Sequence, residues 1–134
     1  MSKVENSERL VHVPLGERAY DILIGPGLLA RAGGEISSRI KGKRAAIVTD
    51  ENVAKFHLEK MQNLLQAKAI IIPAGEEHKN LETISLLWKS FLENGLDRKS
   101  TVIALGGGVL SDMAGFAAST YMRGIAWVGV PTTL

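Results

Sequence analysis

Apolar residues follow two alternating patterns along the chain, short runs bounded by turns and longer stretches with helical spacing. Four short runs end in glycine, proline or polar residues and predict strands over Ala45–Thr49, Ala69–Ile72, Thr101–Leu105 and Ile125–Val130. Between them, apolar residues recur at helical spacing and predict helices over 53–65, 81–94 and about 109–121. The apolar repeat of the first of these helices consists of Val53, Phe56, Met61, Leu64 and Leu65. The repeat from Leu81 to Leu92 is the most regular and gives the strongest helix signal.

The first part of the chain has a different pattern. Two apolar runs, Leu10–Val13 and Ala19–Ile24, are separated by a short polar turn and predict an antiparallel hairpin. Gly25-Pro26-Gly27 then interrupts the chain before an amphipathic stretch, which we expect to be helical to about Arg39.

Alternating strands and helices indicate an α/β fold with a parallel sheet. Thr101–Leu105 is apolar on both faces, as expected for a strand in the interior of such a sheet. We therefore predict one domain over residues 1–134, a Rossmann-like parallel sheet with helices on both faces, right-handed crossovers and an N-terminal β-hairpin.

Composition narrows the class of protein. With 46% hydrophobic and 22% charged residues, the chain resembles an average globular protein. A net charge of +2, with scattered Lys and Arg, does not predict a nucleic-acid surface. The absence of cysteine excludes disulfides and thiolate metal sites and suits the cytoplasm. No apolar run approaches the length of a membrane span, so we expect no membrane partner.

Candidate chemistry lies in the turns that follow the predicted parallel strands, because ligands of open α/β sheets bind beyond the carboxyl ends of the strands. Four such turns carry polar or glycine residues, namely Asp50-Glu51-Asn52, Gly75–Lys79, Gly106–Asp112 and Pro131–Thr133.

The triple glycine before the third of these helices is the most informative of the four turns. Glycine lets the backbone approach a phosphate closely, and a helix N-terminus offers free N–H groups. Gly106, Gly108 and Ser111 approximate the spacing of a dinucleotide-binding fingerprint, although such a turn also occurs for purely structural reasons. The usual ribose-binding acid lies downstream of the glycines, whereas the candidate here, Asp50, lies upstream, so the motif differs from an ordinary Rossmann fingerprint.

Each polar candidate has a structural alternative. Asp112 is expected in the first helical turn, where it either favours the helix dipole or accepts a ribose hydroxyl. Asp50 and Asn52 either cap a helix or bind ribose, and these two roles are compatible. Glu76 and Lys79 either form a solvated helix start or contact the ligand.

The chain has three histidines, His12, His57 and His78, and they are isolated from one another in the sequence. A lone histidine is more often exposed than metal-bound. We assign no metal site to this segment.

Taken together, these blocks resemble the 3-dehydroquinate synthases, a family of sugar phosphate cyclases. The matching blocks cover nearly the whole chain, and they are Asp50-Glu51-Asn52-Val53, Gly75-Glu76-x-x-Lys79, Gly106-Gly107-Gly108-Val109-x-x-Asp112-x-Ala114-Gly115-Phe116, Tyr121-x-Arg123-Gly124 and Val130-Pro131-Thr132-Thr133-Leu134. The last three blocks together are highly specific.

The resemblance implies an NAD site. The implied cofactor-binding residues are Asp50, Asn52, Gly75, Glu76, Lys79, Gly107, Gly108, Val109, Leu110, Ser111, Asp112, Thr132 and Thr133. It also implies that Arg123 recognises the substrate's phosphate across a homodimer interface. The family usually has glycine where this chain has Ser111, so the serine is strained if the position needs a positive φ and adds a phosphate contact if the position is helical.

The resemblance further implies a C-terminal helical domain, absent from this sequence, that holds zinc or cobalt through a glutamate and two histidines. The complete enzyme would convert 3-deoxy-D-arabino-heptulosonate 7-phosphate to 3-dehydroquinate and phosphate in the shikimate pathway, using NAD for a transient oxidation. This segment would then carry no catalytic and no metal-binding residue, and we expect the isolated chain to lack synthase activity. The alternatives are another cyclase, making 2-deoxy-scyllo-inosose or a valiolone-type ring, and a non-catalytic nucleotide-binding module.

Overall fold

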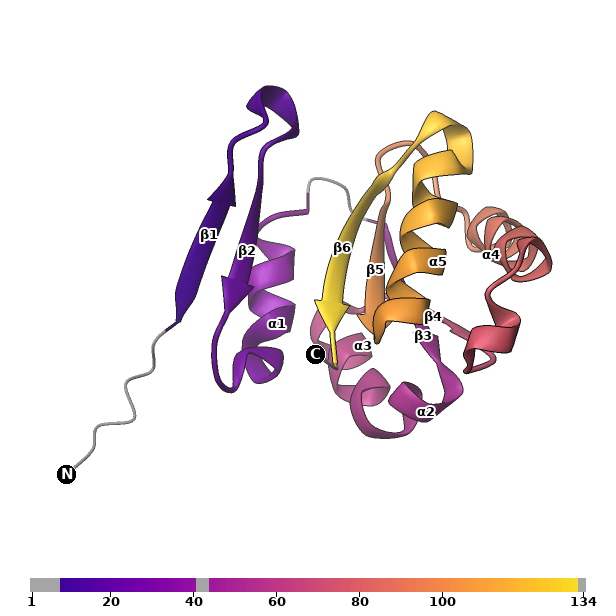
Figure 1. The fold of residues 1–134 in the computed structure, drawn as a ribbon, viewed down its shortest axis with the longest axis horizontal. Coiled ribbons are helices and arrows are strands. Elements are labelled where there is room, and N and C mark those ends of the chain that lie inside the picture. The colour runs from indigo at the N-terminus through magenta and orange to yellow at the C-terminus, as the bar shows by residue number, and fades with distance from the viewer. Residues whose placement is uncertain (1–7, 41–43, 133–134) are drawn as a thin grey trace. The chain divides into compact units, whose positions relative to one another are not determined.

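The computed structural model describes residues 8–40 and 44–132. The chain divides into two compact units, Met1–Ala32 and Gly33–Leu134. The smaller unit holds the predicted hairpin, and the larger unit holds the parallel sheet (Figure 1). Each unit is described separately.

The smaller unit confirms the predicted hairpin. Strands β1 (Arg9–Val13) and β2 (Tyr20–Ile24) pair antiparallel, with Val13 opposite Tyr20 at the turn end. A short 3₁₀ turn over Gly16–Arg18 reverses the chain. Helix α1 (Leu28–Ser37) follows, enters the larger unit at Gly33 and ends two residues before the predicted end at Arg39.

The larger unit contains the predicted parallel sheet. Its strands are β3 (Ala45–Asp50), β4 (Lys68–Ile72), β5 (Thr101–Gly106) and β6 (Ala126–Pro131), arranged in the order β4-β3-β5-β6. All three neighbouring pairs are parallel. Every residue of β5 is buried, which confirms that this run is an interior strand.

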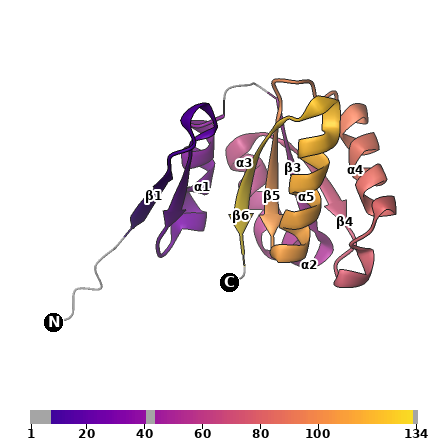
Figure 2. The same cartoon turned by 45° about the horizontal axis from the view of Figure 1, so that its top comes forward.

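Helices cover both faces of this sheet. They comprise α2 (Glu51–Val53), a π-helical turn (Ala54–Leu58) and α3 (Glu59–Leu65) between β3 and β4, α4 (Leu81–Glu93) between β4 and β5, and α5 (Gly108–Thr120) between β5 and β6. Two further 3₁₀ turns span Glu76–His78 and Tyr121–Arg123. In Figure 2, α4 and α5 lie in front of the sheet and α3 lies behind it. Right-handed crossovers produce this arrangement, because the connection from β3 to β4 runs in the opposite direction to the other two.

The main core lies between the sheet and the α4–α5 layer. Leu87 and Phe91 of α4 are fully buried, and Phe91 meets the ring of Tyr121 edge-on at a centroid distance of 5.4 Å. The Tyr121 hydroxyl donates a hydrogen bond of 2.8 Å to the carbonyl of Leu96. These contacts fix α5, and therefore the loop that leads into it, against the end of β5.

The helix that follows β3 differs from its prediction. It begins at Glu51 and contains a π-helical turn, and Phe56 and Leu64, which we assigned to its apolar repeat, are 79% and 48% exposed. Met61 of the same repeat is buried, together with Leu58, which the repeat did not include. Sequence spacing alone could not separate the buried positions from the exposed ones, because both recur at intervals close to one helical turn.

Two adjacent glycines of α1 give a direct test of how this helix packs. A Cβ on Gly33 would lie 2.5 Å from Cβ of Leu64, whereas a Cβ on Gly34 would meet no atom within 4 Å. We expect Gly34→Ala to raise the free energy of unfolding by about 0.5–1 kcal/mol through helix propensity. Gly33→Ala should lower the free energy of unfolding by about 1–3 kcal/mol through overpacking. Chemical denaturation of both variants measures this, and equal effects would contradict the packing described here.

Candidate functional site

The candidate site lies at the carboxyl ends of β3 and β5, the two central strands of the sheet. β3 and β5 are neighbours, but the chain leaves them toward opposite edges, and ligands bind beyond the carboxyl ends of such a strand pair. Thr49 pairs with Leu105 in the ladder, and its buried Oγ1 donates a 2.7 Å hydrogen bond to the Leu105 carbonyl oxygen. The turn that begins at Asp50 therefore lies beside the glycine loop that begins at Gly106.

Asp50 is the N-cap of the helix that follows β3. Its Oδ1 accepts hydrogen bonds from the backbone N–H groups of Asn52 and Val53, each at 2.9 Å. Among the residues that the structure describes, its Oδ2 accepts no hydrogen bond, and Asn52 is exposed. Capping thus occupies one carboxylate oxygen and leaves the other available for a ligand.

The three glycines of the loop after β5 have different surroundings. A Cβ on Gly106 would lie 2.8 Å from Cγ of Leu110, so this glycine is required by packing. Gly107 occupies the N-cap position, where it has no capping side chain. A Cβ on Gly108 would meet no atom within 4 Å, so the first residue of α5 borders open space. The N–H groups of the first helical turn lack partners within the helix, so this end of α5 suits an anion.

Val109, Leu110 and Ser111, the next three residues of α5, differ in their surroundings. Leu110 is buried in the core and Val109 packs against it, so in this conformation their side chains support the loop from within. Ser111 is helical, has no positive φ and donates its N–H to the carbonyl of Gly107 at 3.0 Å. The serine therefore causes no backbone strain, and of the two alternatives for this position the helical one holds.

Lys79 joins the turn after β4 to α5. Its Nζ lies 2.9 Å from Oδ2 of Asp112 and 4.0 Å from Oε1 of Glu76. Three predicted site residues from two distant segments are therefore brought together. The prediction that Asp112 lies in the first turn of its helix was wrong, because α5 begins at Gly108 and contains no acidic residue in its first turn. Asp112 is fixed by Lys79 and not by the helix dipole.

The Lys79 ammonium is perturbed by these partners. The hydrogen bond that Lys79 donates to Asp112, the charge of Asp112 and the charge of Glu76, in decreasing order, raise the pKa of Lys79 above its usual 10.5. The pair is exposed, so it determines geometry more than stability.

Gly75 gives the turn after β4 its shape. Its φ of 112° lies in a region that favours glycine, and a Cβ there would lie 2.6 Å from a carboxylate oxygen of Glu77. The following 3₁₀ turn carries Glu76, and α4 begins afterwards at Leu81 with Asn80 as its N-cap.

Thr132 closes the site at the end of β6. Its N–H donates to the carbonyl of Gly106 at 3.0 Å, which places it directly beside the glycine loop. Its Oγ1 is buried and has no hydrogen-bond partner among the described residues. An unpaired buried hydroxyl is costly, by about 1–3 kcal/mol, and such a group is usually satisfied by a partner. Thr133 lies outside the described residues.

Arg123 lies far from these loops in the same chain. It follows the C-terminal end of α5, whereas the glycine loop precedes the N-terminal end, and the 13 residues of the helix separate them by about 20 Å. Met122, Arg123 and Gly124 all have positive φ, at 49°, 69° and 110°. The turn that carries Arg123 is therefore strained, at about 1–3 kcal/mol for each non-glycine residue.

Sequence reasoning missed two residues that hold the loops together. Thr49 links β3 to β5, and Glu51 Oε1 accepts a 3.4 Å hydrogen bond from the N–H of Ala74 in the turn after β4. The sequence shows Thr49 at the end of an apolar run and Glu51 beside a helix cap. Their partners lie 56 and 23 residues away, so the sequence alone did not reveal these contacts.

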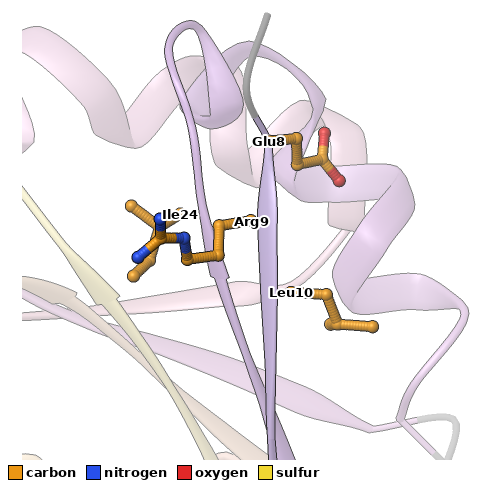
Figure 3. Close-up of a pocket in the computed structure, with 4 residues that line it drawn as sticks. All are labelled: Glu8, Arg9, Leu10 and Ile24. Atoms are coloured by element: carbon orange, nitrogen blue, oxygen red, sulfur yellow. The ribbon is translucent and has the colours of Figure 1, made fainter.

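Two surface depressions in the described part of the chain involve none of these loops. A surface depression on the hairpin is lined by Glu8, Arg9, Leu10 and Ile24, none of which was predicted to bind a ligand (Figure 3). Within residues 8–40 and 44–132, no cluster of three His, Cys, Asp or Glu residues is placed to hold a metal. No helix in these ranges has the length and apolar character needed to cross a bilayer.

The comparisons with family models and with curated proteins both match 3-dehydroquinate synthases. Residues 69–134 match the family model described as 3-dehydroquinate synthase N-terminal. The chain is 54% identical to the 3-dehydroquinate synthase of Agrobacterium fabrum over 138 residues, which covers 99% of this chain and 37% of that protein. The chain therefore spans just over a third of the length of this relative.

Two solved structures share the fold. A 2-deoxy-scyllo-inosose synthase matches with a TM-score of 0.82 and 25% identity, covering 93% of this chain and 36% of the other. The 2-epi-5-epi-valiolone synthase of Streptomyces hygroscopicus subsp. jinggangensis, solved with NAD⁺ and Zn²⁺ bound, matches with a TM-score of 0.72 and 32% identity, covering 85% and 32%. These similarities confirm the α/β fold with its N-terminal hairpin.

The ion pair between Lys79 and Asp112 predicts a specific titration. Because the pKa of Lys79 is raised, the ammonium and its pairing persist below the usual 10.5 and are lost as the pH rises through the higher folded-state pKa. Asp112→Asn should move the titration midpoint of Lys79 back toward 10.5, whereas Glu93→Gln, near a different lysine, should leave it unchanged. Nuclear magnetic resonance of the lysine side chain against pH measures this. The same midpoint in the native chain and in Asp112→Asn would disprove the pairing.

Proposed function

We propose that the chain belongs to the 3-dehydroquinate synthase family and forms the NAD-binding part of such an enzyme. The complete enzyme would convert 3-deoxy-D-arabino-heptulosonate 7-phosphate to 3-dehydroquinate and phosphate, a step of the shikimate pathway in the cytoplasm. The observation that supports this most strongly is the meeting of Asp50, the Lys79–Asp112 pair and the glycine loop at one end of the sheet.

In this proposal the pyrophosphate of NAD lies against the N-terminus of α5. Gly107 and Gly108 allow close approach, and the N–H groups from Gly108 to Leu110, which have no partner within the helix, supply the hydrogen bonds. The open space beside Gly108 fits this role, because a ligand needs access to the backbone there. The partly buried side chain of Ser111 would lie at the edge of the same site.

The two riboses would be held on either side of this loop. The free Oδ2 of Asp50 and the exposed amide of Asn52 suit the hydroxyls of the adenosine ribose. Asp112, fixed by Lys79 and flanked by Glu76, suits the nicotinamide ribose. Carboxylates accept ribose hydroxyls well, but they would repel the pyrophosphate, so their placement away from the first turn of α5 supports this division.

The chemistry of the complete enzyme would need more than this chain. When bound, NAD would accept a hydride from a substrate carbinol, and the resulting ketone acidifies the neighbouring C–H so that phosphate can leave. This chain would orient the cofactor with Gly75, Thr132 and Thr133 and with the backbone of Val109 and Leu110, whose side chains support the loop from within. A divalent zinc or cobalt would be held by residues outside this chain.

Arg123 has a separate role in the proposal. Its distance from the glycine loop excludes a contact with the same site within one chain, and its strained turn presents it on an exposed surface. We propose that it recognises the substrate's phosphate in the neighbouring subunit of a homodimer.

A second candidate is a different sugar phosphate cyclase, and the structural similarity to the 2-deoxy-scyllo-inosose and valiolone synthases favours it. Phosphate release from the heptulosonate phosphate by the complete enzyme separates the two. Release with NAD and zinc or cobalt supports the dehydroquinate synthase, and no release would refute it. The 134-residue chain alone should show no turnover, and any metal-dependent turnover by it would contradict the proposal.

Gly108→Ala tests the glycine loop as a phosphate site. A Cβ at this position meets no protein atom, so the free energy of unfolding should stay unchanged or rise by up to about 1 kcal/mol. The methyl group would occupy the space of the pyrophosphate, and we expect the affinity for NAD to fall by about 10- to 100-fold. Calorimetric titration measures this, with Gly34→Ala as the matched control in another helix. Unchanged affinity in Gly108→Ala would rule out the proposed phosphate position.

Thr132→Val tests whether the unpaired hydroxyl serves a ligand. Removing a buried hydroxyl that has no partner among the described residues should stabilise the free chain by about 1 kcal/mol, yet the affinity for NAD should fall by about 3- to 10-fold. Thr120→Val is the contrasting control, because the hydroxyl of Thr120 donates to the carbonyl of Phe116 at 2.7 Å. That variant should lose stability and keep its affinity for NAD. A loss of stability in Thr132→Val would show that its hydroxyl already has a structural partner.

A further inference from the structure

The helix that leaves the proposed adenosine end of the site contains an irregularity. Directly after α2, residues Ala54–Leu58 form a π-helical turn before α3 continues the helix. Single π turns inside α-helices are rare and occur frequently at functional sites. This one begins four residues after Asp50, the N-cap at the end of β3.

Phe56 lies within this π turn and is 79% exposed, more than any other large hydrophobic side chain of the described residues. Single exposed hydrophobic residues are common on protein surfaces and need no explanation by themselves. Phe56 differs from them because it combines the largest exposure with an irregular backbone next to the candidate site. Its ring is tilted relative to the ring of His57, with a centroid distance of 6.4 Å and an interplanar angle of 56°.

The spacing between Phe56 and Asn52 places both on one side of the helix. Residues four apart in a helix lie on the same face, about 6 Å apart along the axis. Both side chains are exposed, whereas Leu58 and Met61 on the opposite side are buried against the unit. The exposed face therefore presents a polar amide and, one turn later, an aromatic ring.

We propose that Phe56 stacks on the adenine ring of the bound dinucleotide, an inference that rests on the proposed NAD site. Adenine is attached to the ribose carbon next to the 2′-hydroxyl, so a ring one helical turn from the ribose-binding Asn52 is within its reach. Aromatic side chains stack on nucleobases without needing a hydrogen-bond pattern. Phe56 would thus add affinity for the adenosine half of the cofactor and none for the nicotinamide half.

The test compares ligands that contain adenine with one that lacks it. NAD, AMP and nicotinamide mononucleotide are titrated into the native protein, Phe56→Ala and Phe56→Trp, and amide resonances report binding even when it is weak. Phe56→Ala should weaken NAD and AMP by about tenfold and leave nicotinamide mononucleotide unchanged, and Phe56→Trp should restore the affinity. Phe116→Ala, which removes another exposed phenylalanine from α5, is the matched control and should change none of the three affinities.

The outcomes separate this inference from the function on which it rests. If the native protein binds none of the three ligands, the proposed NAD site fails and the inference fails with it. If the native protein binds NAD and Phe56→Ala binds it equally well, only the stacking is overturned. An equal loss for AMP and nicotinamide mononucleotide would also overturn it, because the effect would then be a general loss of structure.

Discussion

The candidate site depends on the register between β3 and β5. These strands are neighbours in the sheet, and a buried hydrogen bond of 2.7 Å from Thr49 Oγ1 to the Leu105 carbonyl holds their carboxyl ends together. Because β5 is buried along its whole length, its end cannot shift without disturbing the core. The capped turn at Asp50 and the glycine loop at Gly106 are thereby fixed side by side, and Thr132 joins them through its hydrogen bond to Gly106.

The glycines of the site are present for different reasons. Gly106 is needed because Leu110 packs against it, Gly75 because its backbone has a positive φ, and Gly108 has no structural need for the absence of a side chain. A glycine without a structural reason beside a helix N-terminus is the feature that a phosphate site requires. The same argument applies to the hydroxyl of Thr132, because a buried polar group without a partner among the described residues suits a ligand that would supply one.

Most of the fold was predictable from the spacing of apolar residues, because strands and helices bury faces with different periods. The central strand Thr101–Gly106 and helix Leu81–Glu93 show this most clearly. Phe56 was assigned wrongly because a π turn changes which residues face inward, and nothing in local spacing reveals it. The pairing of Lys79 with Asp112 depends on two segments 33 residues apart, so the sequence could suggest both residues but not their contact.

In our proposal, NAD binds where the loops after β3, β4 and β5 meet. A titration with NAD, followed through the backbone amide resonances of the chain, measures this binding residue by residue. We expect saturable shifts in three separate segments, Asp50–Asn52, Gly75–Lys79 and Gly107–Asp112, with one common dissociation constant. Shifts confined to the hairpin unit, or no saturable shift in the glycine loop, would contradict it.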